Sequence, residues 1–161
     1  MDYDYIFTAR KRSGDAFSAE PGPIYFLKVP RSAAIYDASH IINAKTWAAE
    51  VQGLADGDQN PNSISPTGDV LIFVHGYNND IAAVLDRQRT LGMALRREGW
   101  KGEIDSFDWP SGNNVLNYIE DRLDASAVAR NLVSKGITLL IAGQDAGCVT
   151  NVHLLGHSTG A

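Results

Sequence analysis

Five consecutive apolar residues, Val70 to Val74, place the strongest restriction on the fold of this chain. The run is rich in β-forming residues and does not alternate with polar ones, so it predicts a strand that is covered on both faces. Strands of this kind are typical of parallel sheets that lie beneath helices. We therefore expect a parallel sheet with helical layers in this part of the chain.

The elements expected after this strand extend the same pattern. Apolar residues at helical spacing predict a helix from Ile81 to Leu95, and Ile104 to Asp108 is the next strand. A helical stretch over 114–141 and a strand from Val152 to Leu155 complete the order. This alternation predicts an α/β fold with a mostly parallel sheet and helices on both faces. In such sheets the reacting groups collect at the carboxyl ends of the strands.

The first 68 residues are harder to interpret. A length of 161 residues fits one domain, in which 1–68 lead into the sheet and 69–161 form the main part of it. The basic segment from Arg10 to Asp15 is expected to be a solvated turn. The other elements expected there are strands over 3–7 and 24–29, a helix over 44–53 and a loop over 56–68.

Composition excludes several classes of function. A formal net charge of -5 argues against a surface for nucleic acid or for an anionic membrane. No apolar run approaches the roughly 18 residues of a membrane-spanning helix, and no secretory signal is expected. The single cysteine, Cys148, excludes an internal disulfide framework and favours a reducing, cytoplasmic compartment. Neither metal-ligand spacing nor a phosphate-binding glycine loop is present, so we expect no metal and no cofactor.

The segment Gly156-x-Ser158-x-Gly160 follows the last expected strand directly. This is the pattern of a nucleophile elbow, in which a serine sits on a sharp turn and its hydroxyl projects above the sheet. Small residues are needed two positions before and after it because strand and helix backbones come close there. The backbone N–H of Thr159 would then stabilise the negative charge on the attacked carbonyl oxygen. The alternative is an incidental glycine turn.

His75 and Gly76 follow the strand that ends at Val74. A loop in this position supplies the second oxyanion donor in α/β-hydrolases, and here the candidate is the backbone N–H of Tyr77. Gly76 would let the backbone approach a substrate without a Cβ. The alternative is an ordinary turn from strand to helix, with a histidine that forms local hydrogen bonds.

The remaining candidates have structural explanations. Trp109 is expected to pack over the neighbouring loop, with a place in a substrate pocket as the alternative. His157 and His153 are expected to be packed residues of the elbow and of the sheet. Asp105 and Asp108 lie near the same strand exit, but neither stands where a triad acid is expected.

From Val70 to Ala161 the chain resembles the α/β-hydrolase superfamily, in particular a poorly characterised and largely bacterial branch. The resemblance rests on four segments: His75-Gly76-Tyr77-Asn78-Asn79, Asp108-Trp109-Pro110-Ser111, Tyr118-x-x-Asp121 and His157-Ser158-Thr159-Gly160. It implies that Ser158 is the nucleophile and that Thr159 and Tyr77 form the oxyanion hole. The implied activity is hydrolysis of an ester or similar acyl bond of a small molecule, through an acyl-enzyme and without a cofactor.

The triad of this superfamily runs Ser, then Asp or Glu, then His along the chain. Here the elbow lies close to Ala161, so the acid and the histidine are expected to lie beyond residues 1–161. The chain is therefore expected to be the front part of a hydrolase that is inactive as supplied. The exposed sheet edge would recruit a second copy or a complementing chain. The alternative function is a non-catalytic binding or assembly module on a hydrolase scaffold.

Overall fold

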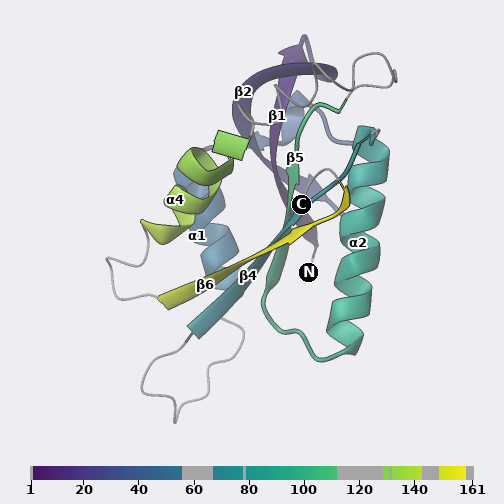
Figure 1. Ribbon diagram of the computed structural model, residues 1–161. Helices are drawn as coiled ribbons and strands as arrows, with labels where there is room; N and C mark the ends of the chain where they lie inside the picture. The colour runs from purple at the N-terminus through teal and green to yellow at the C-terminus, as the bar shows by residue number, and fades with distance from the viewer. Residues whose placement is uncertain are drawn as a thin grey trace.

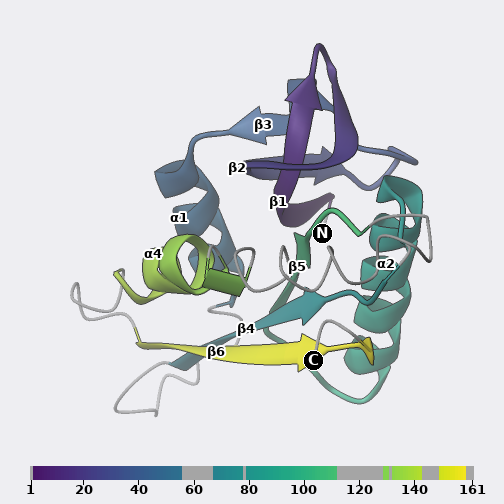
Figure 2. The ribbon, with the colours of Figure 1, turned by 45° about the horizontal axis from the view of Figure 1, so that its top comes forward.

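The computed structural model describes residues 2–55, 67–77, 79–111, 129–130, 132–142 and 149–158. Their strands form one mixed six-stranded sheet in the order β3-β2-β1-β5-β4-β6, with helices on both faces (Figures 1 and 2). This is the mostly parallel α/β architecture that the sequence predicts.

The N-terminal half of the sheet is antiparallel. A long hairpin pairs β1 (Tyr3–Ser13) with β2 (Ala16–Pro30), and the short β3 (Ile41–Ile42) adds to the outer side of β2. Residues 4–10 of β1 are all buried, because apolar clusters pack against both faces of the sheet at this strand.

The second half of the sheet is parallel. It contains β4 (Thr67–Val74), β5 (Glu103–Asp108) and β6 (Val149–Gly156), and β5 also pairs in parallel with β1. Central strands such as β4 and β5 carry helices on both sides, which explains the unbroken apolar run from Val70 to Val74. The three strands therefore end at one edge, where Val74, Asp108 and Gly156 lead into loops.

Two helical layers cover the sheet. Figure 1 shows α1 (Ala44–Ala55) and α4 (Thr138–Ile141) on one side and α2 (Ile81–Arg97) on the other. A π-helical turn, η3 (Leu132–Ile137), precedes α4, and a 3-10 turn, η1 (Ala38–His40), precedes β3. None of the helices in the described ranges is both long and apolar enough to cross a lipid bilayer.

Each face of the sheet has its own apolar cluster. On the α1 side, Phe7 stacks with Phe26 and contacts Trp47 edge-on, and Ile72 and Phe107 belong to the same cluster. The α2 side is held by a smaller cluster, composed of Ile6, Phe17, Leu27, Val29, Tyr36 and Leu85. Burial of these large side chains supplies most of the driving force for folding.

Both ends of α2 carry residues typical of helix ends. Asp80 caps α2 by accepting a hydrogen bond from the Ala83 N–H at 2.7 Å. Gly99 follows α2 with a φ of 94°, a conformation that favours glycine.

The expectation of a solvated turn over Arg10 to Asp15 is confirmed at Gly14 and Asp15 and is wrong for Arg10. β1 continues to Ser13, and the hairpin turns only at Gly14, whose φ is 63°. Arg10 is a buried strand residue on the same face as Thr8 and Ile6. A basic residue can occupy this position because a buried carboxylate faces it, as described below.

The expectation that His153 is a core residue is also wrong. β6 lies at the edge of the described sheet, and His153 is exposed, with Nε2 2.9 Å from Oδ1 of Asp69. Leu154 and Leu155 are also exposed on this strand. Association through this edge stays a prediction.

Candidate active site

Ser158 lies just after the end of β6 in an unusual backbone conformation. Its φ is 58°, and no other non-glycine residue in the described part of the chain has a positive φ. A side chain with a Cβ is disfavoured there by about 1–2 kcal/mol, so the conformation requires support from its surroundings. The residue is exposed to solvent. Ser158 therefore sits on a strained and accessible turn at the carboxyl end of a parallel strand.

The backbone of Gly76 packs directly against this turn. A Cβ added at Gly76 would lie 2.9 Å from the Cβ of Ser158 and 2.7 Å from the carbonyl oxygen of His157. Distances of this size are essentially never seen for a real Cβ. The loop after β4 and the turn after β6 can thus be neighbours only if residue 76 is a glycine.

Backbone hydrogen bonding continues past the end of β6 and fixes the two loops relative to each other. Val74 pairs with Gly156 in the parallel register, and the N–H of His157 donates to the carbonyl oxygen of Val74 at 3.0 Å. The His157 side chain is exposed rather than packed, contrary to the expectation from the sequence.

His75 is held inside the molecule by contacts to both ring nitrogens. Nε2 lies 2.8 Å from Oδ1 of Asp108, and Nδ1 lies 2.7 Å from the carbonyl oxygen of Gly76. The ring stacks on the indole of Trp109 at 5.7 Å, and the indole N–H donates to the carbonyl oxygen of His75 at 2.8 Å. Trp109 is expected from the sequence to pack over a neighbouring loop, and it packs over the loop after β4, which begins at His75.

Asp108 is the centre of a buried polar network. Its Oδ2 accepts a hydrogen bond from Nε of Arg10 at 2.8 Å and another from the hydroxyl of Tyr36. Burial by itself would raise the pKa of Asp108, but the hydrogen bond from His75 and the charge of Arg10 outweigh it and lower the pKa. Asp108 is therefore a carboxylate that ties β5 to β1 and to the loop after β4.

Asn79 connects the same network to the backbone around Gly76. Its side-chain amide donates to the carbonyl oxygens of Gly76 at 2.7 Å and Tyr77 at 3.1 Å. The backbone carbonyl oxygen of Asn79 accepts a hydrogen bond from Nη2 of Arg10 at 2.7 Å. The backbone N–H of Asn79 donates to Oγ of Ser111 at 3.1 Å.

These contacts set the direction of one peptide group. The described chain contains no cis peptide bond, so the carbonyl of Gly76 and the N–H of Tyr77 point to opposite sides. Because the carbonyl faces Asn79 and His75, the N–H of Tyr77 is directed away from both.

The structure brings together Ser158, Gly156, Gly76, Tyr77 and His75 from the residues selected in the sequence. Two further candidates, Thr159 and Gly160, lie outside the described residues, as do Tyr118, Asp121 and Cys148. No group of three His, Cys, Asp or Glu side chains in the described ranges could hold a metal ion.

Sequence reasoning missed the supporting residues Arg10, Tyr36 and Asn79. The available signal was the alternation in β1, which keeps Arg10 in phase with Ile6 and Thr8 if the strand is extended. Thr8 pairs with Asp108 in the parallel register, so a buried arginine near one strand end has its acid on the next strand.

One family model matches the chain over residues 59–161 and describes an alpha/beta hydrolase of unknown function (DUF900). No curated protein and no solved structure matches the chain.

Proposed function

Because this chain belongs to that family of alpha/beta hydrolases of unknown function, we propose that it is a serine hydrolase of the esterase type, with Ser158 as its nucleophile. The substrate class is a small molecule with an ester or similar acyl bond. The fold alone hosts many chemistries, so the proposal rests on the site.

The observation that carries this proposal is the backbone of Ser158. A serine with a φ of 58° at the carboxyl end of a parallel strand costs the fold conformational strain, and strain of this kind clusters at active sites. The glycine required at position 76 supports the same interpretation, since it brings the loop after β4 against the serine.

In the proposed reaction, Oγ of Ser158 attacks the acyl carbonyl and its proton passes to a general base. The backbone N–H groups of Tyr77 and Thr159 stabilise the oxyanion of the tetrahedral intermediate. The bond to the leaving alcohol then breaks, the alcohol takes the proton, and an acyl-enzyme remains until water hydrolyses it. The direction of the Tyr77 N–H, away from Asn79 and His75, is consistent with this role.

The proposal assigns the role of base to none of the four histidines. His75 uses both ring nitrogens inside the loop, His40 accepts a hydrogen bond from the Asp37 N–H, and His153 contacts Asp69. His157 is adjacent to Ser158 in the chain, so its ring cannot turn back to take the proton from Oγ of Ser158. Residues 1–161 alone are therefore expected to turn over poorly, and a slow reaction at Ser158 relies on the oxyanion donors rather than on a base.

Labelling with a fluorophosphonate tests the proposal directly, because phosphonylation of Oγ with loss of fluoride does not require turnover. We expect the modification on the peptide that contains Ser158, and we expect none at that site in Ser158→Ala. Ser134→Ala is a matched control, since Ser134 is an exposed serine of η3. Labelling that is equal in the two variants would contradict an activated Ser158 and favour the non-catalytic binding module.

A further inference from the structure

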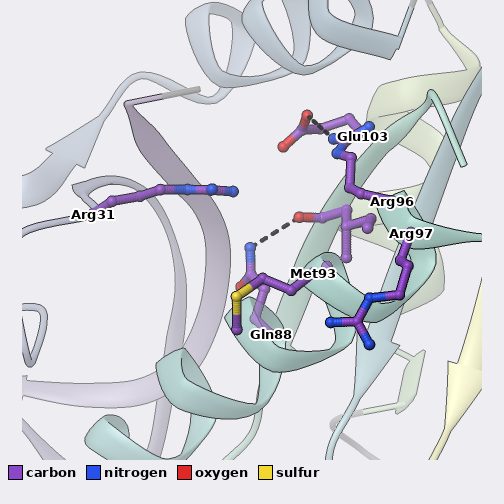
Figure 3. A pocket seen from close by; sticks show the side chains of 8 residues that line it. Arg31, Gln88, Met93, Arg96, Arg97 and Glu103 are labelled. Carbon is purple, nitrogen blue, oxygen red and sulfur yellow. Dashed lines mark hydrogen bonds and ion pairs between the residues drawn. The ribbon is translucent and has the colours of Figure 1, made fainter.

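A cavity lies at the opposite end of the sheet from Ser158. It has a volume of about 470 Å³ and opens between the second half of α2 and the first residues of β5 (Figure 3). Glu103 begins β5 and lines this cavity, whereas Asp108 ends the strand beside the loops of the candidate active site. A volume of this size is in the range of sites for small molecules.

Three guanidinium groups surround the cavity. Arg96 and Arg97 come from the last turn of α2, and Arg31 extends toward this helix from the segment after β2 (Figure 3). Arg31 lies 3.2 Å from a carboxylate oxygen of Asp4, whereas Arg97 forms no ion pair with any described residue. Glu103 is the only acidic side chain among the residues that line the cavity, so its lining carries a net positive charge.

The floor of the cavity contains buried acceptors without donors. The Gln88 side chain donates from Nε2 to the carbonyl oxygens of Tyr5 at 3.3 Å and Ile104 at 2.9 Å, which fixes the orientation of its amide. Its Oε1 then has no hydrogen-bond partner. Oε2 of Glu103 also accepts no hydrogen bond, and its ion pair with Nη2 of Arg96, at 3.7 Å, is longer than a hydrogen bond (Figure 3).

Buried acceptors that lack a donor are rare in proteins and cost free energy. Gln88 and Glu103 are 3% and 2% exposed, so bulk water does not readily solvate them. A ligand for this cavity should therefore offer hydrogen-bond donors at its floor and negative charge toward the arginines. Arginine suits phosphate in particular, because its planar fork donates two hydrogen bonds to such oxygens.

We propose that this cavity is a binding site for a small phosphate monoester that carries hydroxyl groups, of the sugar phosphate class. Its phosphate faces Arg31, Arg96 and Arg97, and its hydroxyls donate to Oε1 of Gln88 and Oε2 of Glu103. The site does not depend on the proposed chemistry at Ser158, since Glu103 lies at the start of β5 and Ser158 follows the end of β6, a strand that runs parallel to β5 through β4.

Isothermal titration calorimetry with glucose 6-phosphate, inorganic phosphate and glucose measures the phosphate contacts and the hydroxyl contacts separately. We expect glucose 6-phosphate to bind most tightly, inorganic phosphate more weakly and glucose not measurably. Arg97→Gln should weaken both anions about tenfold, as expected for loss of a charge-assisted contact. Arg87→Gln, an exposed arginine of α2 that does not line the cavity, is the matched control and should change neither.

Two further variants test the floor. Glu103→Gln should weaken glucose 6-phosphate and leave inorganic phosphate bound as tightly or more tightly. Gly92→Leu should block both ligands; a Cβ at Gly92 meets only Ile104 Cδ1, at 3.7 Å, and circular dichroism and thermal denaturation check that the fold is kept. Ser158→Ala should bind like the unmodified protein, which separates this site from the proposed hydrolase activity. Absence of glucose 6-phosphate binding to the unmodified protein would overturn the proposal, as would equal losses in Arg97→Gln and Arg87→Gln.

Discussion

Nε2 of His75 lies 2.8 Å from Oδ1 of Asp108, and both side chains are completely buried. This contact joins the first residue after β4 to the last residue of β5. The other oxygen of Asp108 binds Arg10 of β1, so a single carboxylate links three strands beside the candidate active site. Several measurable properties should depend on this link and on the strained turn that faces it.

Asp108→Asn should destabilise the protein strongly. The substitution removes the negative charge and leaves Arg10 buried with a weaker partner, which typically costs about 3–5 kcal/mol. The free energy of unfolding from urea denaturation measures this loss. Asp86→Asn is the matched control, because Asp86 is exposed on α2 and its replacement should cost less than about 0.5 kcal/mol. Similar losses in the two variants would show that the network contributes little.

Asp108 should also contribute to the acid limb of the stability curve. Its pKa is lowered in the folded protein, so its contribution is complete above the ordinary carboxyl pKa and is lost as the pH falls through the lowered value. We expect this limb to be shallower in Asp108→Asn than in the unmodified protein. Parallel acid limbs in the two proteins would contradict the assignment.

Glu103 should produce the opposite dependence near neutral pH. Burial raises the pKa of Glu103 from 4.5 to about 7, against the opposing charge of Arg96. The folded protein therefore binds more protons than the unfolded chain between these values, and the free energy of unfolding should fall as the pH rises from about 4.5 to 7, by roughly 3 kcal/mol.

Urea denaturation at pH 5 and pH 8 measures this slope, which should be smaller in Glu103→Gln. The slope that remains is assigned to Asp105, since burial also raises its pKa well above the ordinary value and neither of its oxygens has a hydrogen-bond partner. A Glu103→Gln variant with an unchanged slope would show that Glu103 is charged in the folded protein at pH 5.

Gly76→Ala should abolish fluorophosphonate labelling of Ser158. The new Cβ would lie 2.9 Å from Cβ of Ser158, so one of the two loops must move. Gly53→Ala is the matched control, because a Cβ at Gly53 meets nothing within 4 Å. Gly53 lies inside α1, so this control should keep full labelling and gain about 0.5–1 kcal/mol of stability from helix propensity. Full labelling in Gly76→Ala would disprove the close packing of the loops.

Ser158→Gly should be more stable than Ser158→Ala by about 1 kcal/mol. Neither variant has the hydroxyl, but only glycine adopts a φ of 58° without steric cost. Thermal denaturation of the two variants side by side measures the difference. Equal stabilities would mean that the turn after β6 is not strained.

The parallel half of the fold could be predicted from the sequence because its signals are local. The apolar run Val70–Val74, the capping Asp80 and the glycine at position 99 each act within a few residues. The position of the serine turn follows from its glycines in the same way.

The buried network could not be predicted, because its members are far apart in the chain. Arg10 and Asp108 are 98 residues apart, and a segment with three basic residues in a row resembles a surface turn when viewed alone. Only the pairing of β1 with β5 shows that this arginine has a buried acid as its neighbour. The exposure of His153 likewise depends on which strand lies at the sheet edge.

The family match begins at residue 59, yet the loop that carries Gly76 is anchored by side chains from Arg10 and Tyr36. A version of this protein trimmed to the matched region would discard Arg10 and Tyr36, two partners of Asp108, and would remove β1, the strand that pairs with β5 beside Asp108. Anyone who excises, grafts or recombines this hydrolase core should carry the amino-terminal hairpin along with it.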